Sequence, residues 1–367
     1  MRILLIGEYS NVHWTLAEGL RALGHTVCVV SNGDFWKNYN RDISLVRDVG
    51  SRWGGVKYLF NLLATLPKLR GYDVVQLINP CFVELKAERI YPVYRYLKRN
   101  NRKVFLGGFG MDYYWVNTCR TTQTFRYSDF NFGTQLRDSE GIRAEVREWI
   151  EGEKGRLNRY IAEDCDGIVA GLYEYYACYQ PVFPEKTCFI PFPIKVEKLE
   201  KIERKSHEQP IRFFIGIQRT RNEYKGTHIM LRALERVCSL YPGRCEMVKV
   251  ESVPYEQYQQ LMDSSDVLLD QLYSYTPAMN ALVAMGKGLI VVGGGEEENY
   301  EILGEKVLRP IVNVLPDEEH VFKQLEWLVL HPEEVRRLAY ESREYVVRHH
   351  DYIKVAQRYL DFWQKEN

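Results

Sequence analysis

The sequence lacks an excess of charge of either sign: lysine and arginine together number 49, and so do aspartate and glutamate. A net charge of zero gives no overall basic field to hold a nucleic acid or a membrane, although a local patch is still allowed. With 46% hydrophobic and 27% charged residues among 367, the composition excludes wholesale disorder. The length predicts two domains, at roughly 150 residues each.

Long apolar runs and paired cysteines are also missing. The longest uncharged stretch, residues 271–286, is interrupted by Ser274, Thr276 and Pro277, so it lacks the roughly 20 apolar residues of a membrane-spanning helix. The apolar run before Gly7 is shorter than the roughly 7–15 residues of a signal-peptide core. The eight cysteines contain no C-x-x-C pair, which is typical of reduced thiols. We therefore expect a cytoplasmic protein.

What the sequence does contain is a repeated pattern of strand and helix. A continuous apolar run at residues 3–6 ends at Gly7, and Leu16, Leu20 and Leu23 then follow at helical spacing, with Gly24 where a left-handed helix cap belongs. The pattern predicts further strands at 27–30, 74–78 and 104–106, and helices near 56–69 and 85–98. Strands that alternate with helices indicate an α/β fold with a parallel sheet.

The same pattern starts again after residue 210, where residues 212–216 resemble residues 2–7. Further strands are expected near 247–250, 267–269 and 288–292, and the charge-rich run 196–209 is typical of an exposed linker. The sequence thus predicts two Rossmann-like domains that face each other across a cleft. We expect residues 1–190 to form the first and 191–349 the second, with a C-terminal helix at 350–367 joining the first.

Three loops of the second half follow predicted strands, where ligands of open parallel sheets bind. The first loop runs from Gly216 through Arg219 to Lys225 and Gly226. Two cations and free backbone amides suit a diphosphate, whose charge must be balanced as it departs. The alternative interpretation is a solvated loop with incidental charges.

The second loop leads into an apolar helix. Thr276 is expected to cap that helix and Pro277 to begin its first turn, so that phosphate or sugar can approach the backbone there. An ordinary capped core helix is the alternative. The candidate donor-binding residues of this loop are Tyr275, Thr276, Pro277, Ala278, Met279 and Asn280.

The third loop contains Gly294 and Gly295, which allow backbone conformations that other residues resist. The acids that follow, residues 296–298 and Glu301, are suited to cations or hydroxyl groups. The alternative is that most of them form the polar first turn of a helix.

Two further clusters of polar residues have simpler interpretations. The residues Asp164 and Asp166 form a D-x-D pattern, for which a helix–strand junction is favoured over a metal site. The adjacent His349 and His350 lack the spacing of a helical zinc site, and a solvated helix is favoured. No G-x-G-x-x-G follows either opening strand and no Walker A loop occurs, which argues against a nicotinamide dehydrogenase and a P-loop nucleotidase.

Together, these segments resemble the retaining glycosyltransferases of the GT-B fold, which include glycogen-synthase-like and mannosyltransferase-like members. In the C-terminal half, Arg219 and the Lys225–Gly226 pair are similar to the family's spaced Arg and Lys-Gly, which contact the donor diphosphate. The other similar segments are residues 1–7, 20–27, 72–77, 164–170, 263–269 and 284–288.

The resemblance implies a nucleotide-sugar donor held by the C-terminal half, and a glycan or lipid-linked acceptor presented by the N-terminal half. It also implies retention at the anomeric carbon, with no cofactor and no required metal. The acceptor side would include Gly7, Asn11, His13, Phe109 and Asp112. His13 is chosen because it lies in the first loop after Gly7, which faces the expected cleft, and a structural histidine is the alternative interpretation.

Three positions depart from the family pattern. Tyr275 and Val283 stand where the family carries two glutamates, and Phe109 stands where many relatives have histidine. Valine accepts no hydrogen bond from a ribose hydroxyl, whereas tyrosine can still donate one or stack on a ring. A non-catalytic sugar- or nucleotide-binding subunit and a nucleotide-sugar epimerase are therefore kept as alternatives.

Residues 52–70 mix basic, aromatic and apolar side chains at helical spacing. Such a pattern occurs in helices that lie on a membrane surface. A helix packed on the sheet, with solvated ends, is the favoured interpretation.

Overall fold

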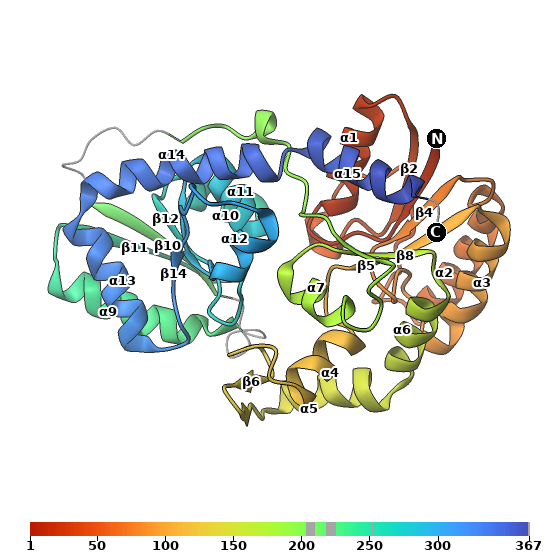
Figure 1. The fold of residues 1–367 in the computed structure, drawn as a ribbon, viewed down its shortest axis with the longest axis horizontal. Helices are drawn as coiled ribbons and strands as arrows, with labels where there is room; N and C mark the ends of the chain where they lie inside the picture. The colour runs from red at the N-terminus through yellow and green to blue at the C-terminus, as the bar shows by residue number, and fades with distance from the viewer. Residues whose placement is uncertain (203–209, 218–224, 252, 366–367) are drawn as a thin grey trace. The chain divides into compact units, whose positions relative to one another are not determined.

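The computed structural model describes residues 1–202, 210–217, 225–251 and 253–365 (Figure 1). The chain divides into two compact units. The first consists of Met1–Phe125, Thr134–Pro193 and Tyr352–Asn367, and the second of Arg126–Gly133 and Ile194–Asp351.

The first unit is built around a parallel sheet whose strand order is β3-β2-β1-β4-β5-β8-β9. The central strands β1, β4, β5 and β8 are buried over most of their length, as expected of a parallel sheet with helices on both faces. The strands are β1 (Arg2–Ile6), β2 (Thr26–Ser31), β3 (Ile43–Ser44), β4 (Val74–Leu77), β5 (Lys103–Gly108), β8 (Gly167–Ala170) and β9 (Thr187–Phe189).

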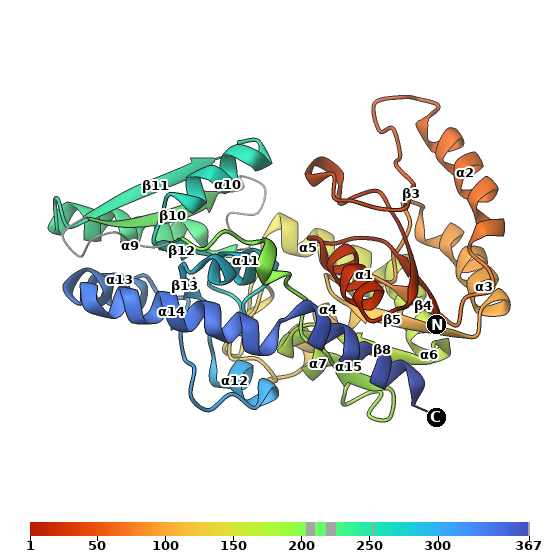
Figure 2. The same ribbon diagram turned by 90° about the horizontal axis from the view of Figure 1, so that it is seen from above.

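The helices of the first unit include the last helix of the chain, α15, which packs against α1 in both views (Figures 1 and 2). The approach is close, because a Cβ atom added at Gly19 would lie 2.4 Å from the carbonyl oxygen of Tyr352. The helices are α1 (Val12–Ala22), α2 (Gly54–Thr65), α3 (Ile90–Asn100), α4 (Tyr113–Thr121), α5 (Glu140–Val146), α6 (Glu153–Asp164), α7 (Tyr173–Tyr179) and α15 (Tyr352–Gln364). Short helical turns are η1 (Phe35–Lys37), η2 (Leu66–Lys68), η3 (Ala87–Arg89) and η4 (Arg147–Glu151), and β7 (Gln135–Leu136) is a short strand.

Two predicted details of this unit can be compared with the structure. Helix α1 ends at Ala22, and Gly24 adopts a φ of 84°, as expected of a left-handed cap. The helix expected from residue 85 begins instead at Ile90, after a turn at η3. The later start places Pro92 in the first turn of α3, where its missing N–H removes no helical hydrogen bond.

The second unit contains a five-stranded parallel sheet with the order β11-β10-β12-β13-β14. Its strands are β10 (Ile211–Ile217), β11 (Cys245–Glu251), β12 (Val267–Leu269), β13 (Ile290–Gly293) and β14 (Val312–Asn313), and β6 (Asn131–Phe132) lies in the short 126–133 part. Its helices are α9 (Thr227–Leu240), α10 (Tyr255–Asp263), α11 (Met279–Lys287), α12 (Glu297–Leu303), α13 (Glu318–Leu330), α14 (Pro332–His349) and the turn η5 (Val196–Lys198).

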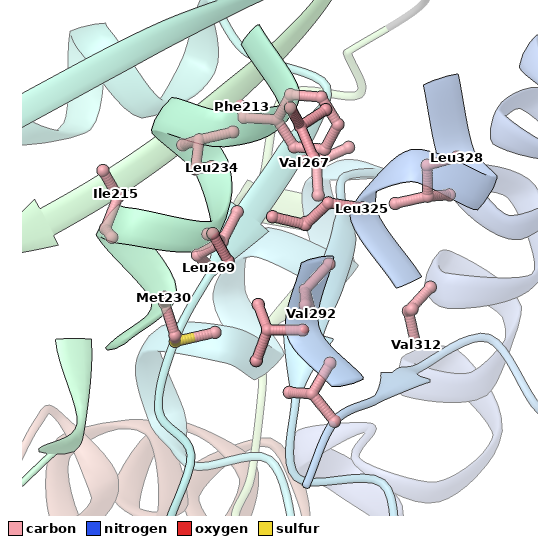
Figure 3. Close-up of a cluster of buried hydrophobic side chains, with 14 of the residues drawn as sticks. Phe213, Ile215, Met230, Leu234, Val267, Leu269, Val292, Val312, Leu325 and Leu328 are labelled. Atoms are coloured by element: carbon pink, nitrogen blue, oxygen red, sulfur yellow. The ribbon is translucent and has the colours of Figure 1, made fainter. Parts of the chain in front are cut away.

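The core of the second unit lies between this sheet and the helices α9 and α13 (Figure 3). Phe213 on β10, Leu234 on α9 and Leu325 on α13 are fully buried. The strand residues Val267 and Val292 extend the same cluster across the sheet. The apolar runs that predicted the second sheet therefore form its buried centre.

The charge-rich run expected to be an exposed linker is partly packed where it is described. Val196 is 5% exposed, and the backbone N–H of Ile202 donates to the carbonyl of Lys287 at 2.8 Å. The charged residues 197, 198, 200 and 201 are exposed as expected. The run is nevertheless not a free linker, because the apolar residues spaced among them pack on α11. Residues 203–209 lie outside the described part of the chain.

The residues His349 and His350 are not solvated, contrary to the prediction. The Nε2 atom of His349 lies 2.6 Å from a carboxylate oxygen of Glu305, and His350 is 5% exposed. The backbone N–H of Ile194 donates to the carbonyl of His350 at 2.6 Å. His350 is buried and His349 is partly buried because α14 ends there against neighbouring segments of the second unit.

The D-x-D pattern is a helix–strand junction, as predicted. Asp164 ends α6 and accepts a hydrogen bond from the Tyr94 hydroxyl at 2.8 Å. Asp166 accepts from Lys98 Nζ and from the Val104 N–H, each at 2.6 Å. The two carboxylates thus fasten separate elements of the first unit.

Within the described part of the chain, none of the helices combines the length and the apolar character that crossing a membrane requires.

Candidate functional site

The order of strands in the second unit points to one place on its sheet. The chain passes from β10 to β11 on one side, and then returns to β12 on the other side of β10. In open parallel sheets, ligands bind at the carboxyl ends of the strands where the direction of winding changes. The candidate site therefore lies at the ends of β10 and β12, beside the first residues of α9 and α11.

The turn before α9 brings Lys225 to this edge. Gly226 has a φ of 70°, a conformation that favours glycine, and caps α9 without a side-chain hydrogen bond. The N–H of Leu272 donates to the carbonyl of Lys225 at 3.0 Å, which ties the turn to the loop after β12. Arg219, the other predicted cation, lies outside the described residues.

A buried carboxylate at the end of β12 was not singled out from the sequence. Asp270 is 8% exposed, and burial raises its pKa, while the charge of Lys225 acts in the opposite direction. The Nδ2 atom of Asn280 lies 3.4 Å from its Oδ1 and donates to the Tyr258 hydroxyl at 3.1 Å. The sequence did offer one signal for Asp270, because an acidic residue stands directly after a predicted buried strand.

The predicted residue Gly216 belongs to the same edge, but for a steric reason. A Cβ atom at this position of β10 would lie 2.8 Å from a ring atom of Tyr258. The glycine therefore allows Tyr258, on α10, to lie across the end of the strand and to reach Asn280.

The helix after β12 begins later than expected. It starts at Met279, and Ala278 is its N-cap, with no side-chain capping bond. Thr276 does not cap it: this residue is 3% exposed, and its carbonyl accepts a hydrogen bond from Ser274 Oγ at 2.7 Å. The predicted cap at Thr276 and the start at Pro277 were wrong, because the loop folds on itself first. The alanine at the N-cap offers no side-chain acceptor to the opening N–H groups of α11.

Tyr275 is only 1% exposed and is held by residues 126–133, which we call the 126–133 segment. Its hydroxyl accepts a hydrogen bond from the backbone N–H of Arg126 at 2.6 Å. The Arg126 guanidinium lies 4.8 Å from the centre of its ring, and the Tyr127 ring lies 5.0 Å away. The side chain suggested as a ligand contact thus fastens a segment of the protein itself.

The acidic residues that follow β13 also bind the 126–133 segment. Arg126 forms ion pairs with Glu296 at 2.9 Å and with Glu298 at 2.5 Å, and the Tyr127 hydroxyl also donates to Glu296. Glu298 lies in the first turn of α12, as the alternative interpretation held. Glu301 is exposed on the same helix.

Close packing, and not an unusual backbone conformation, requires glycine at positions 294 and 295. Neither has a positive φ. A Cβ atom at Gly294 would lie 2.3 Å from the carbonyl oxygen of Ser274, and one at Gly295 would lie 2.7 Å from Ile311. The expectation of an unusual backbone was wrong, because these residues let two loops of the edge touch.

In the first unit, the predicted acceptor residue His13 is fully buried. Its Nδ1 donates to the carbonyl of Gly7 at 2.8 Å, and its Nε2 has no hydrogen-bond partner among the described residues. Burial lowers the pKa of His13 to about 3, so the ring is neutral near pH 7. His13 thus holds the loop after β1 through this hydrogen bond and does not face solvent.

Glu8, which sequence reasoning did not single out, occupies the start of α1. Its carboxylate accepts from the N–H groups of His13 at 3.2 Å and Trp14 at 2.9 Å. Asn11, the formal N-cap at a φ of 69°, makes no side-chain capping bond. Burial raises the pKa of Glu8 to about 8. Because an acidic group already fills this helix end, a ligand phosphate has no vacant site on the same amides.

Phe109 and Asp112 are also buried. The Phe109 ring packs edge-on between His13, at 6.3 Å, and Phe192, at 5.5 Å. Asp112 caps α4 by accepting from the Trp115 N–H, and its other oxygen accepts from the Tyr179 hydroxyl, both at 2.8 Å. Burial raises its pKa to about 7. In this structure both residues support the sheet edge instead of lining an open surface.

Among the described residues, the structure shows no group of three or more His, Cys, Asp or Glu side chains placed to hold a metal ion.

Comparison with known proteins gives two findings. Residues 199–361 match a family model described as glycosyl transferase-like. The fold is similar to that of sucrose-phosphate synthase from Thermosynechococcus elongatus, with a TM-score of 0.60, 13% identity, and coverage of 99% of this chain and 98% of that chain. No curated protein sequence matches this one.

Two more solved structures are similar over nearly the whole chain. HepE from Anabaena, in complex with UDP and glucose, has a TM-score of 0.60 and 10% identity, covering 100% of this chain and 99% of that chain. The catalytic domain of starch synthase IV from Arabidopsis thaliana, bound to ADP and acarbose, has a TM-score of 0.58 and 11% identity, covering 99% and 98%. The fold is therefore GT-B, and the family match, which covers most of the second unit and part of α15, supports a glycosyltransferase.

Proposed function

We propose that this GT-B glycosyltransferase transfers a sugar from a nucleotide-sugar donor to a hydroxyl of a glycan or lipid-linked acceptor, with retention at the anomeric carbon. The second unit would bind the donor. The observation that carries this proposal is the meeting of Lys225, Asp270 and the two uncapped helix starts at the switch point of its sheet. The glycosyl transferase-like match covers the same residues.

The donor diphosphate fits the positive part of this edge. The N-cap residues of α9 and α11, Gly226 and Ala278, make no side-chain capping bond, and backbone N–H groups at helix starts bind phosphate oxygens. Lys225 adds a full positive charge, and we retain Arg219 as its predicted companion. These groups would stabilise the negative charge that develops on the leaving nucleotide.

A donor hydroxyl pair fits Asp270. The two positions at which the GT-B resemblance places glutamates carry Tyr275, which is held by the 126–133 segment, and Val283, which accepts no hydrogen bond. Asp270 is a carboxylate on the same edge with one long hydrogen bond, of 3.4 Å, to Asn280. We propose that it accepts hydrogen bonds from ribose or sugar hydroxyls, with Asn280 and Tyr258 fixing its position.

We propose transfer without a metal ion, because the lysine and the helix starts can balance the diphosphate charge themselves. Chelation with EDTA is then expected to leave the rate unchanged, and a rate restored only by added Mg²⁺ or Mn²⁺ would contradict this part of the proposal.

The test is turnover of the full-length protein with a panel of nucleotide sugars and mixed acceptors. Lys225→Ala should lower kcat/KM at least about tenfold, since a charge-assisted contact is worth about 1.5–3 kcal/mol. Lys323→Ala, an exposed lysine of α13, is the matched control and should leave kcat/KM unchanged. Equal loss in both variants, or no loss in either, would contradict the proposed site.

The same panel separates the alternative of a non-catalytic binding subunit, which the missing pair of glutamates favours. If a donor raises the Tm of the protein, but neither free nucleotide nor a transfer product is formed, the protein is a binding subunit. Conversion of the donor with no acceptor present supports an epimerase. Product that carries the donor's anomeric configuration supports retaining transfer.

A further inference from the structure

Helix α2 exposes an apolar face that none of the described residues of the first unit covers. Its inner face is buried through Gly54, Tyr58, Leu62 and Thr65, which confirms the favoured prediction of a packed helix for that side only. The opposite side carries a row of large apolar side chains at helical spacing. Their exposed fractions are 63% for Trp53, 62% for Val56, 71% for Phe60 and 55% for Leu63.

The loop before α2 extends this surface. Val46 is 53% exposed and Val49 is 85% exposed. The loop is folded against the start of the helix, because a Cβ atom at Gly54 would lie 1.8 Å from the carbonyl oxygen of Asp48. We call the six exposed side chains the α2 face: Val46, Val49, Trp53, Val56, Phe60 and Leu63.

Basic residues surround the α2 face. Residues 46–70 contain five basic residues and one acidic residue, Asp48, although the whole chain has no net charge. All five basic side chains are exposed: Arg47, Arg52, Lys57, Lys68 and Arg70. Figure 2 shows α2 at the outer edge of the first unit.

Exposed apolar side chains in a contiguous row are unfavourable in water and mark a site of contact. Large apolar residues on one side of a helix with lysine and arginine beside them are the features of helices that lie in the surface of a bilayer. The local excess of positive charge complements anionic lipid headgroups. A protein partner would have to supply both a wide apolar groove and a ring of acids.

We propose that the α2 face binds the surface of an anionic membrane, with its apolar side chains inserted at the headgroup boundary and its basic side chains on lipid phosphates. The inference does not rest on the proposed function, since lipid binding is measured without donor or acceptor. If both hold, the enzyme works on acceptors held at such a surface.

The test is flotation of the full-length protein with vesicles. One set contains equal amounts of phosphatidylcholine and phosphatidylglycerol, and the other contains phosphatidylcholine alone. The parent protein is expected to float with the anionic vesicles and to float much less with the neutral ones. The double variant Trp53→Ser/Phe60→Ser should lower the partition coefficient at least about tenfold, because each buried aromatic contributes strongly to transfer.

Charge and folding are controlled separately. Lys57→Glu/Lys68→Glu should abolish the preference for anionic vesicles. Leu240→Ser/Val307→Ser removes apolar side chains of the second unit that are 61% and 75% exposed, and it should bind as the parent does. All variants should keep the parent Tm. Failure of the parent to float with anionic vesicles, or an equal effect of the control variant, would overturn the proposal, as would self-association of the parent that the Trp53→Ser/Phe60→Ser change abolishes.

Discussion

At the scale of single residues, several carboxyl groups near the ends of the strands are buried. Their surroundings decide whether they are ionised. Glu8 and Asp112 both cap helices of the first unit through backbone N–H groups. Removal from water opposes ionisation more strongly than those hydrogen bonds favour it, so burial raises the pKa of each, to about 8 and about 7. Sequence patterns name such residues as polar loop positions and give no sign of their burial.

The raised pKa of Asp112 predicts a dependence of stability on pH. Between its ordinary pKa of 3.8 and about 7, the folded protein keeps a proton that the unfolded chain has lost. The free energy of unfolding contributed by Asp112 therefore falls as the pH rises through that range. Asp112→Asn cannot lose a proton, so its stability relative to the parent should improve between pH 4.5 and 8, by at least about 1 kcal/mol in urea unfolding.

The control for this prediction is Asp317→Asn. Asp317 is an exposed aspartate that caps α13 through the N–H of His320 at 2.7 Å, so its replacement reports the loss of a capping carboxylate alone. Parallel pH profiles for the parent and Asp112→Asn would contradict the prediction.

At the scale of elements, the 126–133 segment is an unusual feature of the second unit. It comes from the middle of the part of the chain that forms the first unit. It is attached through Arg126 and Tyr127 to the loops that follow β12 and β13. The site loops are therefore braced by a segment distant in sequence, and the acids after β13 are neutralised from within the protein.

Loss of the Arg126 side chain should loosen this segment. Arg126→Ala leaves Glu296, whose side chain is only 11% exposed, without its cation, and a poorly solvated charge without a partner is unfavourable. We expect cleavage within residues 126–133 under limited proteolysis to become several-fold faster. Arg143→Ala breaks an ion pair whose side chains are 55% and 68% exposed, a kind that contributes little, and should not change the cleavage rate.

At the scale of the whole molecule, the chain returns to its first unit at its end. Helix α15 packs on α1, and Lys103 Nζ on β5 donates to the carbonyls of Trp363 at 3.0 Å and Lys365 at 2.8 Å. Trp363 is 1% exposed. The first unit is therefore incomplete without residues that follow the second unit in the sequence.

Because α15 packs on the first unit, we expect a substitution in this helix to lower the stability of the protein strongly. Trp363→Ala should lower the free energy of unfolding by about 3–5 kcal/mol, as expected for removal of a buried aromatic side chain. Trp36→Ala, at 58% exposure, is the matched control and should change it by less than about 1 kcal/mol. Urea unfolding measures both, and similar values for the two variants would show that α15 does not stabilise the first unit.

The sequence by itself determined the repeated strand–helix pattern and the two Rossmann-like units, because buried parallel strands require continuous apolar runs and their helices require amphipathic spacing. It also led to the edge that carries Lys225 and the start of α11, since ligand loops follow such strands. The tertiary structure alone decided which polar residues are buried, as for His13 and Asp112, and which charges are already paired, as for Glu296. Those outcomes depend on contacts between residues far apart in the chain, such as Arg126 with Tyr275, and local pattern carries no information about them.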